Sequence, residues 1–172
     1  ICQSERVGFF YSIFLNFAAW SPLSANFGVY QMITYMLLHG GPTHIIFNML
    51  GLIVFGPTCE RYLGSNKFLY FYLISGVISA LAHFIMNIQS EVPLVGASGA
   101  IYGVLFLFIM SNPRENLYLF FIPIGIKAKY FGSAILAYEI VSGFVSHDNV
   151  AHFGHVGGAL AGIFMFFIYR RK

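Results

Sequence analysis

The chain has 172 residues, of which 58% are hydrophobic and only 9% are charged, and its formal net charge is +3. A soluble domain carries about 25% charged residues, so this chain would have too few polar groups to cover its surface in water. The small net charge argues against a nucleic-acid partner, and two distant cysteines, Cys2 and Cys59, cannot form a disulfide framework. The composition therefore predicts an integral membrane protein that crosses a lipid bilayer several times.

The N-terminal region gives the weakest signal for a membrane helix. The apolar stretch from Val7 to Trp20 is shorter than the roughly 20 residues that a helix needs to cross the hydrocarbon core. We leave open whether it forms an interfacial helix, a membrane-embedded loop or part of a first span. The next region, Ser21–Gly41, mixes glycine and proline with aromatic residues and is predicted to be an ordered, partly buried loop on the outer side.

Five later stretches carry almost no charge and are predicted to be membrane helices, at residues 42–58, 67–88, 97–111, 130–145 and 149–169. Eight of the nine basic residues fall in alternate connections and in the C-terminal tail, which the positive-inside rule assigns to the cytoplasm. This side would hold Arg61, Lys67, Arg114, Lys127, Lys129, Arg170, Arg171 and Lys172. The predicted fold class is all-α, a polytopic transmembrane helix bundle that forms one domain over residues 1–172.

A serine flanked by glycines begins the third predicted helix, in the sequence Gly96-Ala97-Ser98-Gly99. The first turn of a helix has free backbone N–H groups, which can stabilise an oxyanion that forms beside a nucleophilic hydroxyl. The glycines would let a substrate backbone approach closely. The simpler interpretation is a capping serine in a tight turn, and taken alone that interpretation is the more common one.

The last predicted helix carries a histidine on the same face as two glycines that are four residues apart. The third helix repeats this glycine spacing directly after its serine, and small residues at this spacing let membrane helices pack closely. Docking the two glycine faces would bring His155 close to Ser98, where a neutral imidazole could act as a general base. The alternative is a histidine bonded to a neighbouring backbone group. The glycines are Gly99 and Gly103, and Gly158 and Gly162.

Two further polar side chains, His44 and Asn48, share one face near the outer end of the first predicted helix. Both can donate hydrogen bonds to a carbonyl oxygen that gains negative charge. The alternative is ordinary hydrogen bonding between helices, which is common for these residue types in membranes. Because His44, Ser98 and His155 fall at similar depths, we predict a water-accessible cavity that opens to the outer side.

The remaining polar residues have weaker signals. His152 and His39 are assigned structural or loop roles, and Asp148 is assigned to an outer loop. Tyr102 lies one turn after Ser98 and could pack against an imidazole ring. Glu139 is the acidic residue inside a predicted span, and we expect it to be protonated or hydrogen-bonded within the bundle.

These motifs, in this order and on separate helices, resemble those of the rhomboid intramembrane serine proteases over about residues 30–172. The resemblance implies a Ser98–His155 dyad, an oxyanion hole from His44, Asn48 and a backbone N–H, and no metal or cofactor. Tyr102 would pack on the histidine, and Gly96 with the helix glycines would support the site. The matching residues are His44-x-x-x-Asn48, Gly96-Ala97-Ser98-Gly99-Ala100-Ile101-Tyr102-Gly103 and His155-x-x-Gly158-x-x-x-Gly162.

The resemblance also implies a six-helix core, whose first helix would be truncated here or replaced by the Val7–Trp20 stretch. His152 competes for the base role but is disfavoured, because its i+3 residue is a histidine instead of a glycine. The family's first loop often carries a Trp-Arg pair, whereas this chain has Tyr30-Gln31, which leaves the anchoring of this loop open.

The function implied is the cleavage of single-span membrane proteins within or near their transmembrane helices, in a bacterial inner membrane. Substrates would need local unwinding and would enter past a mobile fourth predicted helix. A zinc protease would need His-Glu-x-x-His, whereas the histidine pair of the last helix, His152-Phe153-Gly154-His155, lacks the glutamate. An aspartyl protease would need two aspartates, and Asp148 is the one aspartate of the chain. The alternatives are a catalytically inactive rhomboid-like protein that binds membrane proteins, and a small transporter.

Overall fold

The computed structural model describes residues 3–118, 124–146 and 150–170. Within these ranges the elements are α1 (Gln3–Phe17), α2 (Gln31–Thr34), the 3-10 turn η1 (Tyr35–Leu37), α3 (Pro42–Leu63), α4 (Ser65–Met86), α5 (Ser98–Ser111), β1 (Asn116–Tyr118), β2 (Gly125–Lys127), α6 (Ala128–Val145) and α7 (His152–Tyr169). Predictions that concern Cys2, Asp148, Asn149, Arg171 and Lys172 lie outside the described residues.

The helical fold class is confirmed, since α3 to α7 coincide with the five stretches predicted to be helices. Within the described ranges, α3, α4 and α7 are long and apolar enough to cross a membrane. Helix α5 is apolar but has only 14 residues. Five membrane spans therefore remain a prediction, and three of them are supported by length and composition.

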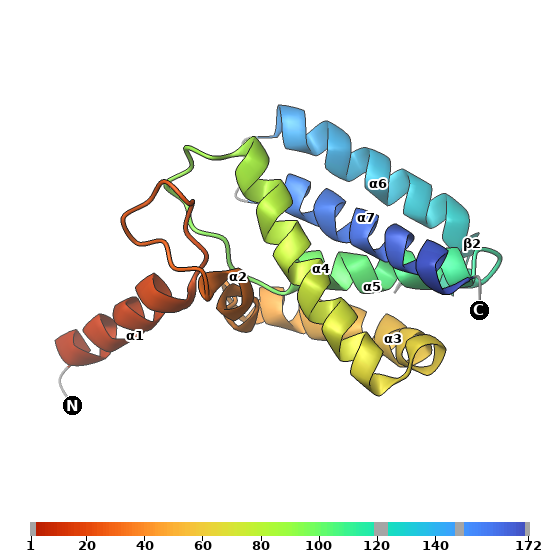
Figure 1. Ribbon diagram of the computed structural model, residues 1–172, viewed down its shortest axis with the longest axis horizontal. Helices are drawn as coiled ribbons and strands as arrows, with labels where there is room; N and C mark the ends of the chain where they lie inside the picture. Colours follow the sequence, from red (N-terminus) through yellow and green to blue (C-terminus); the bar gives the residue numbers. More distant parts are fainter. Residues whose placement is uncertain (1–2, 119–123, 147–149, 171–172) are drawn as a thin grey trace.

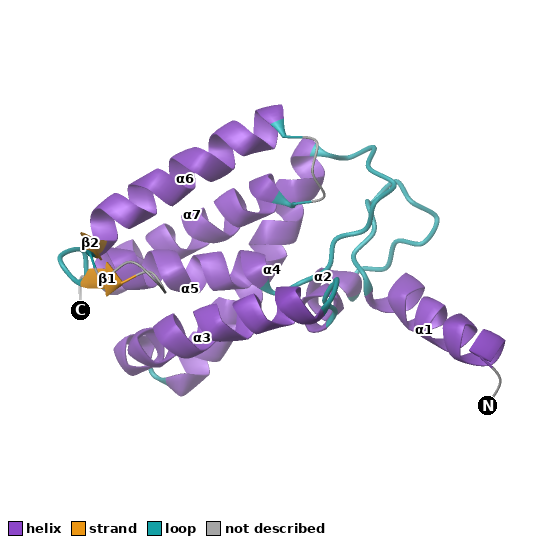
Figure 2. Cartoon of the chain, turned by 180° about the vertical axis from the view of Figure 1, so that it is seen from behind, coloured by secondary structure: helices purple, strands orange, loops and turns teal. Residues whose placement is uncertain are grey.

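Helix α5 forms the centre of the bundle, with α3, α4, α6 and α7 around it (Figures 1 and 2). Its side chains from Gly99 to Ile109 are buried with the exception of Tyr102. A helix that is apolar on all sides gains most from being surrounded by other helices. The core around it includes Phe71 of α4 and Ala159 of α7.

The helices from α3 to α7 alternate in direction, so their basic residues lie at one end of the bundle. The ends of α3, α5 and α7 lie there with the C-terminus, at the right of Figure 1. The ammonium of Lys67, at the start of α4, lies 5.1 Å from the ring centroid of Tyr169, at the end of α7. The first residues of α5 and α7 consequently lie together at the opposite end, which is the outer end in the predicted topology.

The region Ser21–Gly41 was predicted to be a loop, but it also contains the short elements α2 and η1. Tyr35 of η1 is buried and donates a hydrogen bond to the Gly76 carbonyl oxygen of α4 at 2.8 Å. Burial raises the pKa of the Tyr35 phenol well above its usual range, so this group remains a donor. This bond attaches the outer region to the helix bundle.

The Gln31 side chain anchors this outer region through hydrogen bonds to the backbone. Its buried amide nitrogen donates to the Asn26 and Asn16 carbonyl oxygens at 2.9 and 3.1 Å, and its amide oxygen accepts from the Gly28 N–H at 3.0 Å. A neutral amide thus ties together the backbone between Asn16 and Gly28. The apolar N-terminal stretch is helical as α1, which projects away from the bundle in Figure 1.

A two-stranded antiparallel sheet lies between α5 and α6, and the sequence analysis predicted no strand there. Asn116 pairs with Lys127, and Tyr118 pairs with Gly125. Leu117 is partly buried and packs against the helical core, whereas Asn116 and Tyr118 are exposed. So short a strand shows no clear alternation of apolar and polar residues, which explains why it was missed.

Candidate active site

The backbones of α5 and α7 touch at the glycines singled out in the sequence. A Cβ atom on Gly158 would overlap the Gly99 carbonyl oxygen and lie 2.8 Å from the Gly99 carbonyl carbon. A Cβ atom on Gly162 would overlap the Gly103 carbonyl oxygen and lie 2.9 Å from the Leu107 nitrogen. Only glycine fits at these two positions of α7, because the atoms it meets belong to the backbone and cannot rotate away.

Helix α4 packs at the same junction and contacts both α5 and α7, which the sequence analysis did not foresee. The Ser79 side chain occupies the space where a Cβ of Gly99 would stand, and the Ser75 Oγ lies 2.7 Å from the corresponding point on Gly103. The available signal was the pair of small residues, Ser75 and Ser79, spaced four apart. Helices α4, α5 and α7 therefore pack closely on one another through small residues.

This packing brings the predicted serine and histidine into direct contact. The Ser98 Oγ lies 2.8 Å from the His155 Nε2. Ser98 is the first residue of α5, so the first N–H groups of that helix lie beside its hydroxyl. The Tyr102 ring stacks on the His155 ring with centroids 4.3 Å apart and an interplanar angle of 2°. The tyrosine thereby restricts the orientation of the imidazole.

Helix α3 supplies two further hydrogen-bond donors, His44 and Asn48, to the site that contains Ser98 and His155. The His44 Nδ1 accepts a hydrogen bond from the Gly40 N–H at 3.2 Å, which leaves the proton of a neutral ring on Nε2. The buried Asn48 amide donates one N–H to the His44 carbonyl oxygen at 2.8 Å and keeps a second N–H. Both groups therefore retain a donor for a ligand.

Gly96 allows His44 to reach this position. A Cβ atom on Gly96 would lie 2.6 Å from both Cε1 and Nε2 of the His44 ring, and the Gly96 φ angle is +109°. A side chain would be strained in this conformation and would also displace the imidazole. A glycine is therefore needed at position 96 because the His44 side chain of helix α3 packs directly against its backbone.

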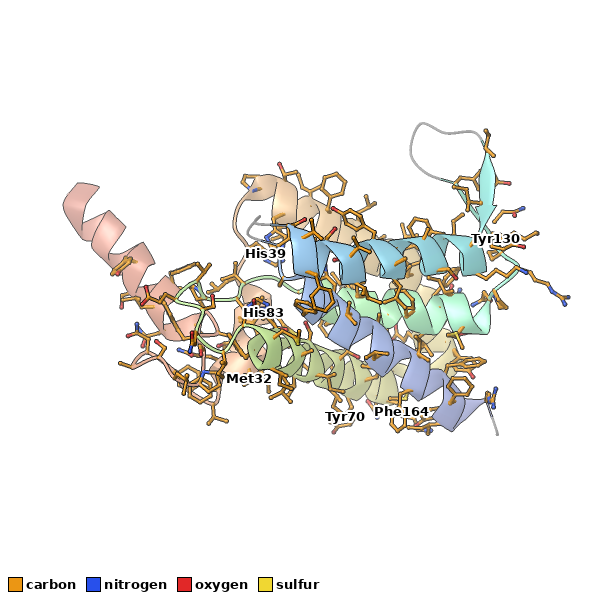
Figure 3. All side chains as sticks on the ribbon, turned by 90° about the horizontal axis from the view of Figure 1, so that it is seen from above. Met32, His39, Tyr70, His83, Tyr130 and Phe164 are labelled. Carbon is orange, nitrogen blue, oxygen red and sulfur yellow. The ribbon has the colours of Figure 1, made fainter. Side chains whose placement is uncertain are left out.

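A cavity of about 870 Å³ connects the polar groups of the site. It is lined by Ser98, His155, His44, Asn48 and Tyr102. Its wall also includes Phe47 of α3 and Phe153 of α7, so the lining combines polar centres with apolar surface. Figure 3 shows His39 and His83 toward one end of the bundle and Tyr130 at the other. His83 lines the cavity, and His39 lies in the loop between η1 and α3 with its ring centroid 5.2 Å from that of His44.

Comparison with known proteins identifies the family. A family model described as the rhomboid domain matches residues 26–172. The chain belongs to the rhomboid family. This rhomboid is 31% identical over 150 residues to the YdcA protein of Bacillus subtilis, which covers 86% of this chain and 71% of YdcA. It is therefore an integral membrane protein of a family whose members include proteases.

Two relatives are named rhomboid proteases. GluP of Bacillus subtilis is 34% identical over 137 residues, which cover 78% of this chain and 25% of GluP. GlpG of Haemophilus influenzae is 31% identical over 143 residues, which cover 81% of this chain and 69% of GlpG. This rhomboid spans only a quarter of the length of GluP, so the activity of the whole relative does not transfer directly.

Glu139 of α6 reaches the same site, although the sequence analysis assigned it no catalytic role in this rhomboid. Its Oε2 lies 2.6 Å from the His152 Nδ1, and its Oε1 accepts a hydrogen bond from the Tyr102 hydroxyl. The same Oε1 is 3.1 Å from the His155 Nδ1. Glu139 is thus hydrogen-bonded within the bundle, which is one of the two states expected from the sequence, and His152 has a partner there.

Three of these groups could be considered as metal ligands. Among the described residues, Glu139, His152 and His155 each offer one ligand atom, and these atoms lie within 4.8 Å of one another. Ligands of a tetrahedral zinc ion stand about 3.3 Å apart, since each bond is about 2.0 Å long. The separation of 2.6 Å between the Glu139 and His152 atoms is that of a hydrogen bond. We therefore interpret the cluster as a hydrogen-bonded network.

Proposed function

We propose that this rhomboid is an intramembrane serine endopeptidase in which Ser98 is the nucleophile and His155 is the general base. The 2.8 Å contact between the Ser98 Oγ and the His155 Nε2 carries this proposal. It occurs at the start of a helix and at the wall of a cavity, where a substrate carbonyl could meet both the hydroxyl and free N–H groups. Membership of the family, with relatives named as proteases, supports the same chemistry.

The reaction follows from this contact. As the Ser98 Oγ attacks the carbonyl carbon of the substrate, the His155 Nε2 takes the hydroxyl proton. The imidazolium then donates that proton to the leaving amine, and the peptide C–N bond breaks to leave an acyl-enzyme. A water molecule, deprotonated in turn by His155, hydrolyses the ester and restores Ser98. Every proton transfer in this sequence uses one nitrogen, Nε2, which must be unprotonated at the start.

Three donors are proposed to stabilise the oxyanion, namely the Ser98 backbone N–H, the His44 Nε2–H and the second N–H of Asn48. The free donors of His44 and Asn48 and their shared position in the cavity wall support this role. These bonds are worth most when negative charge has developed on the carbonyl oxygen.

The Asn48→Ala variant should lower kcat by about 10²-fold with little change in KM, because one transition-state donor is lost. Steady-state cleavage of a reporter membrane protein in proteoliposomes measures both constants. Asn66→Ala, at an exposed position of α4, is the matched control. A rise in KM alone would assign Asn48 to substrate binding instead.

The proposed substrates are single-span membrane proteins in a bacterial inner membrane, and residues 1–172 are proposed to act as one domain. The cavity wall includes Phe47 of α3 and Gly143 of α6, so a substrate helix that enters between these helices would reach Ser98. The Phe153 ring packs closely on Gly143 and lies 5.1 Å from the Phe144 ring. We propose that outward movement of α6 breaks these aromatic contacts to admit the substrate.

A fluorophosphonate probe tests the proposal, because it reacts with an activated serine and mimics acyl transfer. We expect one labelled site in the wild type, at Ser98, and both labelling and cleavage should disappear in Ser98→Ala. Ser133→Ala, at a serine near the start of α6 that bonds to Lys129, serves as the control. An intact protein that neither labels nor cleaves any reporter would instead favour the membrane-protein binder. Solute or proton flux in liposomes that persists in Ser98→Ala would favour the transporter.

A further inference from the structure

An acidic side chain in the interior of a membrane protein needs a physical explanation. Glu139 is only 3% exposed and lies in helix α6, within a bundle whose core is mainly apolar. Burial of a carboxylate is costly unless its oxygens receive hydrogen bonds from several donors. Three donors from two other helices surround it, namely Tyr102, His152 and His155. Helix packing alone does not require three donors to surround one carboxylate.

The two oxygens of Glu139 have different surroundings. Oε2 is bound by the His152 Nδ1 at 2.6 Å. Oε1 accepts from the Tyr102 hydroxyl and lies 3.1 Å from the His155 Nδ1. His152 and Tyr102 therefore fix the carboxylate in a single orientation, and that orientation directs Oε1 toward the nitrogen of His155 that does not contact Ser98.

Within residues 3–118, 124–146 and 150–170, the group that faces the His155 Nδ1 is the Glu139 carboxylate. The Nδ1 atom is buried and makes no well-aligned hydrogen bond, and the Glu139 Oε1 at 3.1 Å is a carboxylate oxygen within reach. Bonds between catalytic groups are often poorly aligned without substrate and tighten as charge develops. A small rotation of the imidazole, in the plane set by Tyr102 stacking, would align the Nδ1–H with Oε1.

We propose that Glu139 is a positioning residue for the dyad, which holds the proton of His155 on Nδ1 and thereby leaves Nε2 free to accept the proton of Ser98. This inference rests on the proposed function and extends the dyad to a third group on helix α6. The carboxylate also stabilises the imidazolium that forms during the attack, because a negative charge then faces a positive one in a site of low polarity. Tyr102 contributes twice, by stacking on His155 and by binding Glu139.

The Glu139→Gln variant tests this role at nearly constant volume. The glutamine amide can present its NH₂ group to Nδ1, which would favour the tautomer with the proton on Nε2. We expect kcat to fall by about ten- to a hundredfold with KM within about twofold of the wild type, since the substrate does not contact Glu139. Glu115→Gln, which removes the same charge from an exposed loop position, should leave both constants unchanged. Equal kcat values in Glu139→Gln and the wild type would overturn the proposal.

A spectroscopic measurement on the wild type keeps the proposal testable if Glu139→Gln folds poorly. Nitrogen-15 NMR of histidine-labelled protein, with His155 assigned by its loss in His155→Ala, distinguishes the two neutral tautomers. We expect the Nδ1-protonated form for His155 in the wild type and a shift toward the Nε2-protonated form in Glu139→Gln. An Nε2-protonated His155 in the wild type contradicts the proposal whatever the kinetics. A wild type that neither cleaves nor labels would instead count against the proposed function.

Discussion

Replacing His155 with alanine is expected to lower kcat for peptide-bond cleavage by about 10³-fold or more, whereas His152→Ala should lower it by no more than about tenfold. Of these two histidines, it is His155 that contacts the Ser98 hydroxyl, through Nε2 at 2.8 Å. His152 is one turn earlier, and its ring centroid is 6.4 Å from that of His155. His152 instead binds Glu139, so its loss removes a hydrogen bond to a carboxylate, worth about 1.5–3 kcal/mol, from a group that acts indirectly.

The comparison should be made by steady-state cleavage of one reporter in proteoliposomes, with thermal unfolding of both variants as a folding control. Fluorophosphonate labelling adds a readout that does not depend on substrate entry. Full activity in His155→Ala together with loss of activity in His152→Ala would show that the base has been assigned to the wrong histidine.

The Gly158→Ala variant is expected to lose most cleavage activity and to unfold at a lower temperature. The added methyl would overlap the Gly99 carbonyl oxygen, so α5 and α7 must move apart or rotate. Overpacking of this kind costs about 1–3 kcal/mol, and more when the obstacle is backbone. The same movement separates Ser98 from His155, because each lies within one turn of the contact.

Gly8→Ala is the matched control, since a Cβ atom there meets nothing within 4 Å. In the helix α1, alanine should be neutral or more stable by up to about 1 kcal/mol, because glycine is a poor helix former. Circular dichroism melts and cleavage assays of the two variants separate helix propensity from helix contact. A Gly158→Ala protein with wild-type melting temperature and activity would mean that the two helices do not pack as described.

The contact between α5 and α7 was predictable because its cause is local and periodic. Glycines four residues apart on two helices, each beside a polar residue, are sufficient to predict which faces meet. The helical elements followed in the same way from long uncharged stretches. The location of His44 and Asn48 in the cavity wall followed from their shared helical face and from the alternation of basic residues.

Other parts of the site could not be predicted because they depend on tertiary packing. Glu139 is distinctive as an acidic residue in an apolar helix, but its neighbours depend on the rotation and tilt of α6 against α5 and α7. Ser75 and Ser79 resemble ordinary polar residues until α5 is seen to pack on them. The anchoring by Gln31 depends on carbonyl oxygens at Asn16 and Asn26, and no side-chain pattern identifies these acceptors.

The shortness of α5 allows the depth of Ser98 in the bilayer to be predicted. Its 14 residues rise by about 21 Å at 1.5 Å each, which is about 9 Å less than the thickness of a typical hydrocarbon core. If its last turn stands at the basic surface, the serine is submerged by roughly that difference beneath the opposite leaflet boundary. The length of α5 therefore sets the expected depth of the Ser98 hydroxyl, and adding a turn to this helix would raise the hydroxyl toward the lipid headgroups.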